Sequence, residues 1–401
     1  MEDEEKIPES LREVPASEIL AKIEKGEPVE YDNVIIKGDL DIRKLDLPKS
    51  DNKPIITSQI KITNSWIKGK LNFQNVIIEK QAFFDYTYFG AHSCFLEVQF
   101  KKGAIFRKAK FREGAVFNEA KFDFQAVFDE AQFQWSAVFI KTQFNSEALF
   151  NQAWFIWDAT FNEAQFNAEA HFWGTQFKRH ALFDNSSFNK SAYFWKGAYF
   201  GGFAQFFETQ FNGDVLTFKN AVFKCPIAQE GACRRVKNVL ERNGDREEAG
   251  YHFYREMEAK RIQKGIRGGS RLGLGECLKT DTWSFRKFLF FDVIEFIFVQ
   301  KIFGYGVHPW RLITSWGIIV AAFAALYLFG SGLIGATQLF DYVKFSLATA
   351  IAPGYIATII SPGSTGFKLA QEYQAVAIVE SIFGTFLWAG FIATFARKYM
   401  R

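Results

Sequence analysis

Apolar side chains recur along this chain with a period of 11 residues. From Ala104 the sequence aligns with itself nine times, and the copies begin at every eleventh residue up to Ala192. The first position of each copy is Ala and the third is Phe, the sixth is small, and the eighth is Phe except at Tyr199 in the last copy. The copies read AIFRKAKFREG, AVFNEAKFDFQ, AVFDEAQFQWS, AVFIKTQFNSE, ALFNQAWFIWD, ATFNEAQFNAE, AHFWGTQFKRH, ALFDNSSFNKS and AYFWKGAYFGG.

An 11-residue period also fits a right-handed coiled coil, but the composition argues against one. The chain holds 48 Phe and 3 Met, and the copies are rich in Phe and Asn and poor in Leu. The Phe residues lie alternately 5 and 6 apart, a spacing that scatters them around a helix axis. We expect instead short extended runs separated by corners, with Phe filling the interior and the small residue at the tight part of the wall.

In these features the chain resembles the pentapeptide-repeat family, in its variant with alternating spacings of 5 and 6. The resemblance implies a cytosolic right-handed, four-sided β-helix in which two 11-residue copies make one coil of 22. Equivalent residues then stack at about 4.8 Å along the axis. Before the regular copies, apolar and polar residues alternate less strictly, and this pattern places the start of the solenoid near residue 30. The register slips after Gly202, and the solenoid ends near Phe223, because terminal repeats are atypical.

A basic connector follows the repeat. Its periodicity predicts two helices, broken at Arg242–Asp245, and the pair Glu256 and Lys260 suggests that the second is a solvated helix. Residues 266–276 read as a flexible loop. Residues 285–310 are apolar but interrupted by charges, which favours an amphipathic helix at a membrane surface over a span.

Two further segments are long and apolar enough to cross a membrane. Leu312–Phe329 contains no charged residue. A second span, from about Ala375 to Ala396, contains a single charged residue, Glu380. Basic residues flank the start of the first span and the end of the second, so we expect a multi-pass protein of the cell membrane with both termini in the cytosol. The acidic first ten residues lack the apolar core of a signal peptide, which agrees with this topology.

Between the spans lies a short apolar helix followed by a loop, and this layout resembles the two-transmembrane tetrameric cation channels. FDYVKFSLATA occupies the place of the pore helix, and its Thr349 leads into the filter position. AIVESIFGTFLWAGFIATFARK occupies the place of the inner helix, where Gly384 matches the family's hinge glycine. The resemblance covers about residues 310–401 and implies a homotetramer. Together with the repeat and the change in composition, it divides the chain into four parts. They are an acidic, partly helical segment (1–29), the solenoid (30–224), the helical connector (225–309) and the two-transmembrane pore domain with its re-entrant helix (310–401).

The filter position departs from the K⁺ pattern TVGYG. Gly354 and Tyr355 match, but Ala352 replaces the threonine whose hydroxyl is a ligand. Pro353 has a fixed φ and no N–H, and Ile356 falls where a glycine usually adopts positive φ. We therefore expect a segment that is not K⁺-selective, since carbonyl coordination depends on that backbone.

Glu380 is the acidic residue of the second span. It precedes Arg397 by 17 residues, about 25 Å along a helix, which puts it near the outer mouth. Attraction of cations is one interpretation of an intramembrane acid, and a buried hydrogen bond to the short helix is the other. The sequence leaves both open.

Charge and composition narrow the remaining function classes. The net charge of +4 does not argue for nucleic acid, and basic residues among the acidic ones weigh against DNA mimicry. The four cysteines and five histidines show no metal-ligand spacing, and no nucleophile–base set appears, so we expect neither a cofactor nor an enzyme.

The sequence favours a passive channel for permeant ions. The resemblance to the cation channels implies that these ions are cations. The alternative is a non-conducting membrane scaffold that tetramerises the solenoids to bind a cytosolic protein or ligand. Exposed tryptophans form a candidate contact patch, or simply occupy corners of the coil; they are Trp135, Trp154, Trp157, Trp173 and Trp195.

Overall fold

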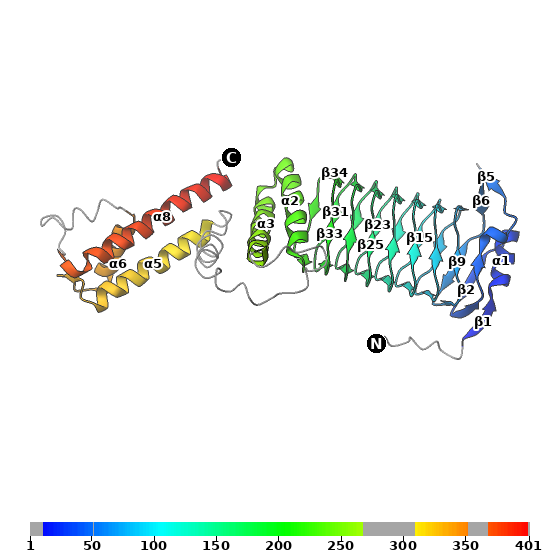
Figure 1. Ribbon diagram of the computed structural model, residues 1–401, viewed down its shortest axis with the longest axis horizontal. Helices are drawn as coiled ribbons and strands as arrows, with labels where there is room; N and C mark the ends of the chain where they lie inside the picture. Colours follow the sequence, from blue (N-terminus) through cyan, green and yellow to red (C-terminus); the bar gives the residue numbers. More distant parts are fainter. Residues whose placement is uncertain (1–10, 51, 268–308, 352–367, 400–401) are drawn as a thin grey trace. The chain divides into compact units, whose positions relative to one another are not determined.

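The computed structural model describes residues 11–50, 52–267, 309–351 and 368–399. They fall into two compact units, and the boundary between the units lies at Gln263. The first unit is a β-solenoid with helices at both ends, and the second is a group of apolar helices (Figure 1). Residues 268–276 of the predicted loop, most of the segment 285–310, and Ala352, Pro353, Gly354, Tyr355 and Ile356 lie outside the described residues. The first two residues of that predicted loop, Ile266 and Arg267, are instead helical.

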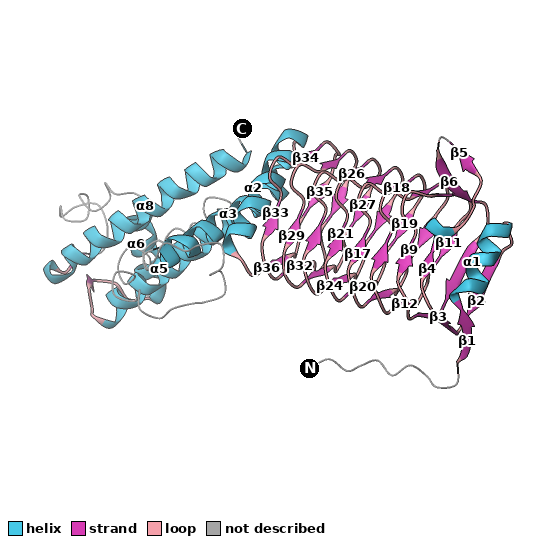
Figure 2. Ribbon diagram, turned by 45° about the vertical axis from the view of Figure 1, so that its right-hand side comes forward, coloured by secondary structure: helices cyan, strands magenta, loops and turns pink. Residues whose placement is uncertain are grey.

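The solenoid has four parallel sheets, which the chain visits in turn as it winds (Figure 2). Sheet 1 contains β1 (Arg12–Pro15), β3 (Val34–Lys37), β8 (Trp66–Ile67), β12 (Tyr88–Phe89), β16 (Lys110–Phe111), β20 (Gln132–Phe133), β24 (Trp154–Phe155), β28 (Gln176–Phe177), β32 (Tyr199–Phe200) and β36 (Val222–Phe223). Sheet 2 contains β4 (Leu40–Asp41), β9 (Leu71–Asn72), β13 (Ser93–Cys94), β17 (Ala115–Val116), β21 (Ala137–Val138), β25 (Ala159–Thr160), β29 (Ala181–Leu182) and β33 (Ala204–Gln205).

The other two sheets complete each coil. Sheet 3 contains β5 (Lys49–Ser50), β6 (Lys53–Ile56), β10 (Ile77–Ile78), β14 (Gln99–Phe100), β18 (Lys121–Phe122), β22 (Gln143–Phe144), β26 (Gln165–Phe166), β30 (Ser187–Phe188) and β34 (Gln210–Phe211), where β5 and β6 pair antiparallel. Sheet 4 contains β2 (Val29–Asp32), β7 (Ile60–Thr63), β11 (Ala82–Phe83), β15 (Ala104–Ile105), β19 (Ala126–Val127), β23 (Ala148–Leu149), β27 (Ala170–His171), β31 (Ala192–Tyr193) and β35 (Leu216–Thr217).

The predicted coil of 22 residues is confirmed. Ala104 pairs with Ala126, so each 11-residue copy supplies two sides of the coil and two copies close it. The Ala of the first position and the Phe of the third and eighth point inward and are buried. Rings one coil apart stack face to face, as Phe106 and Phe128 do with centroids 5.0 Å apart. Each fully buried Phe contributes roughly 1.5–3 kcal/mol of transfer free energy to this core.

The fifth position of the repeat has a backbone conformation that sequence reasoning missed. Lys108, Glu119, Glu130 and Lys141 all have φ between 54° and 56°, in the left-handed region. This conformation turns the chain out of one short strand and toward the next. The position holds no β-branched residue in any of the nine copies, which is the signal in the sequence, because β-branched residues resist positive φ.

The register slips earlier than predicted, within the last copy. Phe177 pairs with Phe200, 23 residues on, so one extra residue has entered this coil. Lys196 and Gly197 both have positive φ there. The extra residue is accommodated at the corner because glycine adopts this conformation without a steric penalty.

The solenoid begins at residue 12, not near residue 30 as predicted. β1 pairs with β3 in sheet 1, although its sequence REVP carries no trace of the repeat. The helix α1 (Ala16–Lys25) follows and contacts β1, β2 and β4, so it covers the N-terminal end of the core with Ile19 and Ile23. The predicted end near Phe223 is confirmed by β36.

Two helices follow the solenoid, as the sequence predicted, and the structure shows that they close its other end. α2 (Pro226–Asn243) contacts the last strands, and α3 (Arg246–Arg267) follows after a left-handed Gly244. The expectation that Glu256 is solvated was wrong, because this side chain is almost fully buried. Burial by itself would raise the pKa of Glu256, but hydrogen bonds from Lys260, Lys237 and Arg234 hold that pKa below its usual range.

The second unit contains the two predicted long helices and the short one between them. They are α5 (Pro309–Phe329), α6 (Leu339–Ile351) and α8 (Gln374–Tyr399). A two-stranded ribbon of β37 (Leu333–Ile334) and β38 (Lys368–Leu369) and a 3₁₀ turn (Gln371–Tyr373) complete it. At 13 residues, α6 is too short to cross a membrane, as predicted.

Candidate functional site

The three helices of the second unit pack against one another in every pairing. Tyr327 from α5 and Phe345 from α6 meet edge to face, with ring centroids 5.1 Å apart. Ala324, Leu333 and Tyr342 complete the small buried core. α6 is thus held between the two long helices by side chains of both.

Glu380 lies at the centre of this packing and is fully buried. The hydroxyl of Tyr327 donates a hydrogen bond to Glu380 Oε2 at 2.8 Å, and the hydroxyl of Ser346 donates one to Oε1. One carboxylate on α8 therefore connects α5 and α6. The structure shows the hydrogen bond to the short helix that the second interpretation of Glu380 requires. The other interpretation, attraction of cations by Glu380, stays a prediction.

Gly384 lies one helical turn further along α8, where the backbone of α6 crosses. A Cβ built on Gly384 would lie 2.1 Å from the carbonyl oxygen of Ala350. The absence of a side chain therefore permits direct contact between the two backbones. The residue predicted as a hinge is, in this structure, the crossing point of α6 and α8.

Thr349 is the residue of the predicted filter segment that the structure describes. It is buried at the C-terminal end of α6, and its hydroxyl donates to the carbonyl oxygen of Phe345 at 2.9 Å. That hydroxyl is used within the helix. The five filter residues after Ile351 lie outside the described part, so the predictions about them stay predictions.

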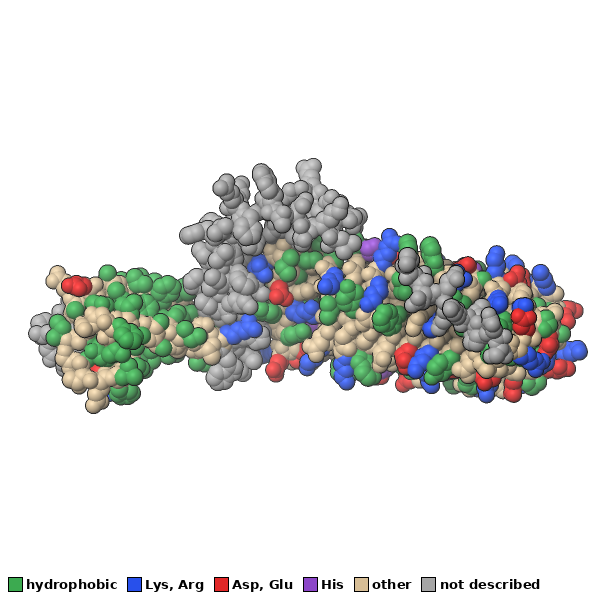
Figure 3. Space-filling view, turned by 90° about the horizontal axis from the view of Figure 1, so that it is seen from below, with side chains coloured by type: hydrophobic (Ala, Val, Ile, Leu, Met, Phe, Trp, Pro, Cys, Tyr) green, Lys and Arg blue, Asp and Glu red, His purple; other side chains and the backbone are tan. Residues whose placement is uncertain are grey.

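The outer surface of this unit is strongly apolar, as the space-filling view shows (Figure 3). Large apolar side chains point outward along both long helices, among them Ile318, Phe329, Ile382 and Phe386. Both helices are long and apolar enough to cross a membrane. An apolar exterior around a buried polar centre is the arrangement that a bilayer favours.

The solenoid carries a second conspicuous surface. All of its six tryptophans lie on sheet 1 or at the corners that border it; they are Trp66, Trp135, Trp154, Trp157, Trp173 and Trp195. Three of the five tryptophans predicted as a patch lie exposed at corners, Trp154 is exposed on the sheet itself, and Trp195 is half-buried. The corner interpretation is therefore confirmed for Trp135, Trp157 and Trp173, and the contact patch stays a prediction, although these corners all border one face.

Cations cover several of these rings. The Nζ of Lys178 lies 4.7 Å from the ring centroid of Trp154, and the Cζ of Arg179 lies 4.5 Å from that of Trp157. Lys196 lies above Trp173 and Trp195. Sheet 1 is therefore an aromatic and cationic face, a composition that is typical of binding surfaces.

The family of the solenoid follows from its repeat. A family model described as pentapeptide repeats (9 copies) matches residues 128–176, within the stacked coils. The solenoid is a pentapeptide-repeat domain. The match does not extend to the helical unit, and searches of curated proteins and of solved structures found no match for the chain.

Proposed function

We propose that this protein is a homotetrameric ion channel of the cell membrane, in which the pentapeptide-repeat domain is cytosolic. α5 and α8 would be the outer and inner spans, and α6 the pore helix of each subunit. Ions would pass down their gradient through the segment that follows α6, and both termini would face the cytosol.

The observation that carries this proposal is the close crossing of α6 and α8 at Gly384. A short helix that cannot cross a bilayer needs rigid support at membrane depth, because non-helical backbone there is tolerated only against protein or water. The backbone contact between Gly384 and Ala350 and the hydrogen bonds of Glu380 supply that support directly before the predicted filter.

The filter residues favour weak selectivity. Pro353 and Ile356 do not suit the repeated inward carbonyls by which K⁺ channels replace the water of the ion. We therefore propose a non-selective cation pathway.

Flux from liposomes that hold the purified protein tests this proposal. We expect cation flux above that of protein-free liposomes, with reversal potentials that discriminate little between K⁺ and Na⁺. Strong K⁺ selectivity would contradict the proposed filter, while the channel itself would stand.

The departure of Pro353 and Ile356 from the K⁺ filter pattern also favours one alternative, a non-conducting scaffold. In that case the pore-like unit assembles four solenoids, and their aromatic faces bind a cytosolic protein. A tetramer that shows no flux under any ion gradient would support the scaffold and overturn the channel.

A further inference from the structure

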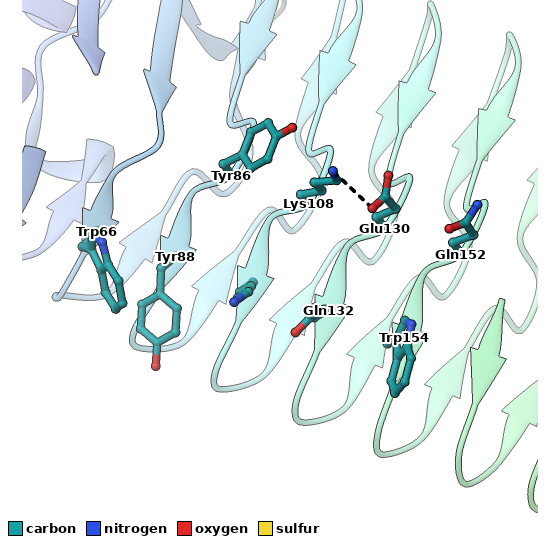
Figure 4. A pocket seen from close by; sticks show the side chains of 9 residues that line it. Trp66, Tyr86, Tyr88, Lys108, Glu130, Gln132, Gln152 and Trp154 are labelled. Carbon is teal, nitrogen blue, oxygen red and sulfur yellow. Dashed lines mark ion pairs between the residues drawn. The ribbon is translucent and has the colours of Figure 1, made fainter. Parts of the chain in front are cut away.

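A groove runs along sheet 1 of the solenoid, near its N-terminal half (Figure 4). It is open to solvent and encloses about 410 Å³. Trp66 and Tyr88 pack in a tilted arrangement at one end with ring centroids 4.5 Å apart, and Trp154 lines the other end. Lys108 and Lys110 line the part between them.

The groove is suited to a negatively charged, extended occupant. Its charged lining consists, within the described residues, of two lysines and Glu130, and Glu130 already pairs with Lys108 at 3.3 Å. Lys178 adds a further positive charge beside Trp154. The excess of positive charge between aromatic ends favours carboxylates with adjoining apolar groups.

The chain itself carries such a segment. Residues 1–10 read MEDEEKIPES, with four consecutive acidic residues, then Lys6 and an Ile-Pro pair, so the segment is acidic overall. The segment leads into β1, which belongs to sheet 1 as the groove does. The strands of this sheet run parallel, so the chain enters all of them from the same side. The side from which it enters β1, at Arg12, is therefore also the side on which Lys108 precedes β16.

The lengths also agree. Strands in a sheet are about 4.8 Å apart, so β12 and β16 lie about 14 and 19 Å from β1 in the order of sheet 1. An extended chain advances about 3.3 Å per residue. If residues 1–10 ran extended along sheet 1, Pro8 would be level with Tyr88, and the acidic residues from Glu5 backward would be level with Lys110 and beyond. The segment is thus long enough to reach the groove in the matching order, with the apolar pair at the aromatic end and the acidic residues at the lysines.

We propose that the acidic segment of residues 1–10 binds in this groove of its own chain. The solenoid face is then a peptide-binding surface for acidic segments, and the chain's own segment occupies it until a competing acidic partner displaces it. This inference is independent of ion conduction.

Binding of a labelled peptide of residues 1–11 to the full chain in detergent tests the proposal. The native chain is compared with a chain that carries Glu2→Gln, Asp3→Asn, Glu4→Gln and Glu5→Gln. We expect the neutralised chain to bind the peptide at least about tenfold more tightly, since a tethered segment competes at millimolar effective concentration. Binding should weaken as salt is added, because the contacts are between charges near the surface.

Two variants of the neutralised chain locate the site. Lys108→Gln with Lys110→Gln should lose the peptide, whereas the matched pair Lys121→Gln with Lys141→Gln, which alters β18 and the corner before β22 of sheet 3, should retain it. Circular dichroism checks that both remain folded. Equal binding by native and neutralised chains, or full binding by the groove variant, would overturn the proposal. A change of oligomeric mass in the groove variant would assign the groove to contact between copies instead.

Discussion

Two residues of α8 determine how the helical unit is built. Glu380 accepts hydrogen bonds from Tyr327 and Ser346, and Gly384 admits the backbone of α6 at a distance that no side chain permits. The first provides directed polar contacts inside an apolar unit, and the second provides close van der Waals contact. Small residues at helix crossings have this role in membranes, where no hydrophobic force drives helices together.

Gly384→Ala should therefore destabilise the unit, although alanine is the better helix former. The added methyl group meets the carbonyl of Ala350, and such overpacking costs about 1–3 kcal/mol. A lower midpoint of thermal unfolding in detergent, together with reduced flux, is the expected result. Gly317→Ala on α5 is the matched control, since nothing lies within 4 Å of its added Cβ. If both variants unfold like the native protein, the crossing is not a structural requirement.

At the scale of single elements, α3 contains a buried histidine, from which we expect a pH-dependent stability of the cap that α2 and α3 form on the solenoid. His252 is fully buried, and neither ring nitrogen has a hydrogen-bond partner among the described residues. Its Nε2 lies 3.9 Å from Glu248, and Arg255 is the nearby cation. Burial lowers the pKa of His252, and the opposing attraction of Glu248 does not cancel this effect.

The cap should therefore lose stability as the pH falls. Below about pH 6.5 the unfolded chain binds a proton at this histidine that the folded chain does not, so the free energy of unfolding decreases. Above that pH the stability is fully present. Thermal unfolding followed by circular dichroism should show a midpoint that falls between about pH 7 and pH 5.

His252→Leu should flatten that dependence, while His92→Leu, at an exposed position, should leave it unchanged. An unaltered slope in the first variant would show that other groups cause it.

For the whole molecule, the proposed channel and the proposed scaffold both require four copies. Large apolar side chains are exposed on both α5 and α8. In the proposed tetramer, some of them would contact lipid and others would contact neighbouring subunits. The proposed pore would need the subunits to surround one axis, as they do in known channels.

We expect the purified protein in detergent to have a mass near four chains once bound detergent is subtracted, as measured by light scattering. A monomer would contradict both functions. A dimer would exclude the four-fold pore and would require a different arrangement of the spans.

Much of this fold could be predicted from the sequence, because its signals are one-dimensional. The 22-residue coil follows from the spacing of Phe106, Phe111 and their equivalents, since identical residues stack when the chain repeats its path. The two long helices follow from uninterrupted apolar runs. The N-terminal limit of the solenoid could not be predicted, because β1 joins sheet 1 by backbone pairing alone and its residues carry no repeat.

Only the tertiary structure decided which residues meet. Glu380 is 53 residues from Tyr327 and 34 from Ser346, and no periodicity links them. The spacing of Glu256 and Lys260 along α3 suggests a solvated pair. In the fold, α2 places Arg234 and Lys237 against Glu256, and the buried carboxylate becomes part of an ion cluster. The sequence by itself determined the repeat, the core columns and the apolar helices, since these depend on local order along the chain. The packing of distant elements determined the polar contacts and the close backbone crossing, because those depend on which surfaces come together in space.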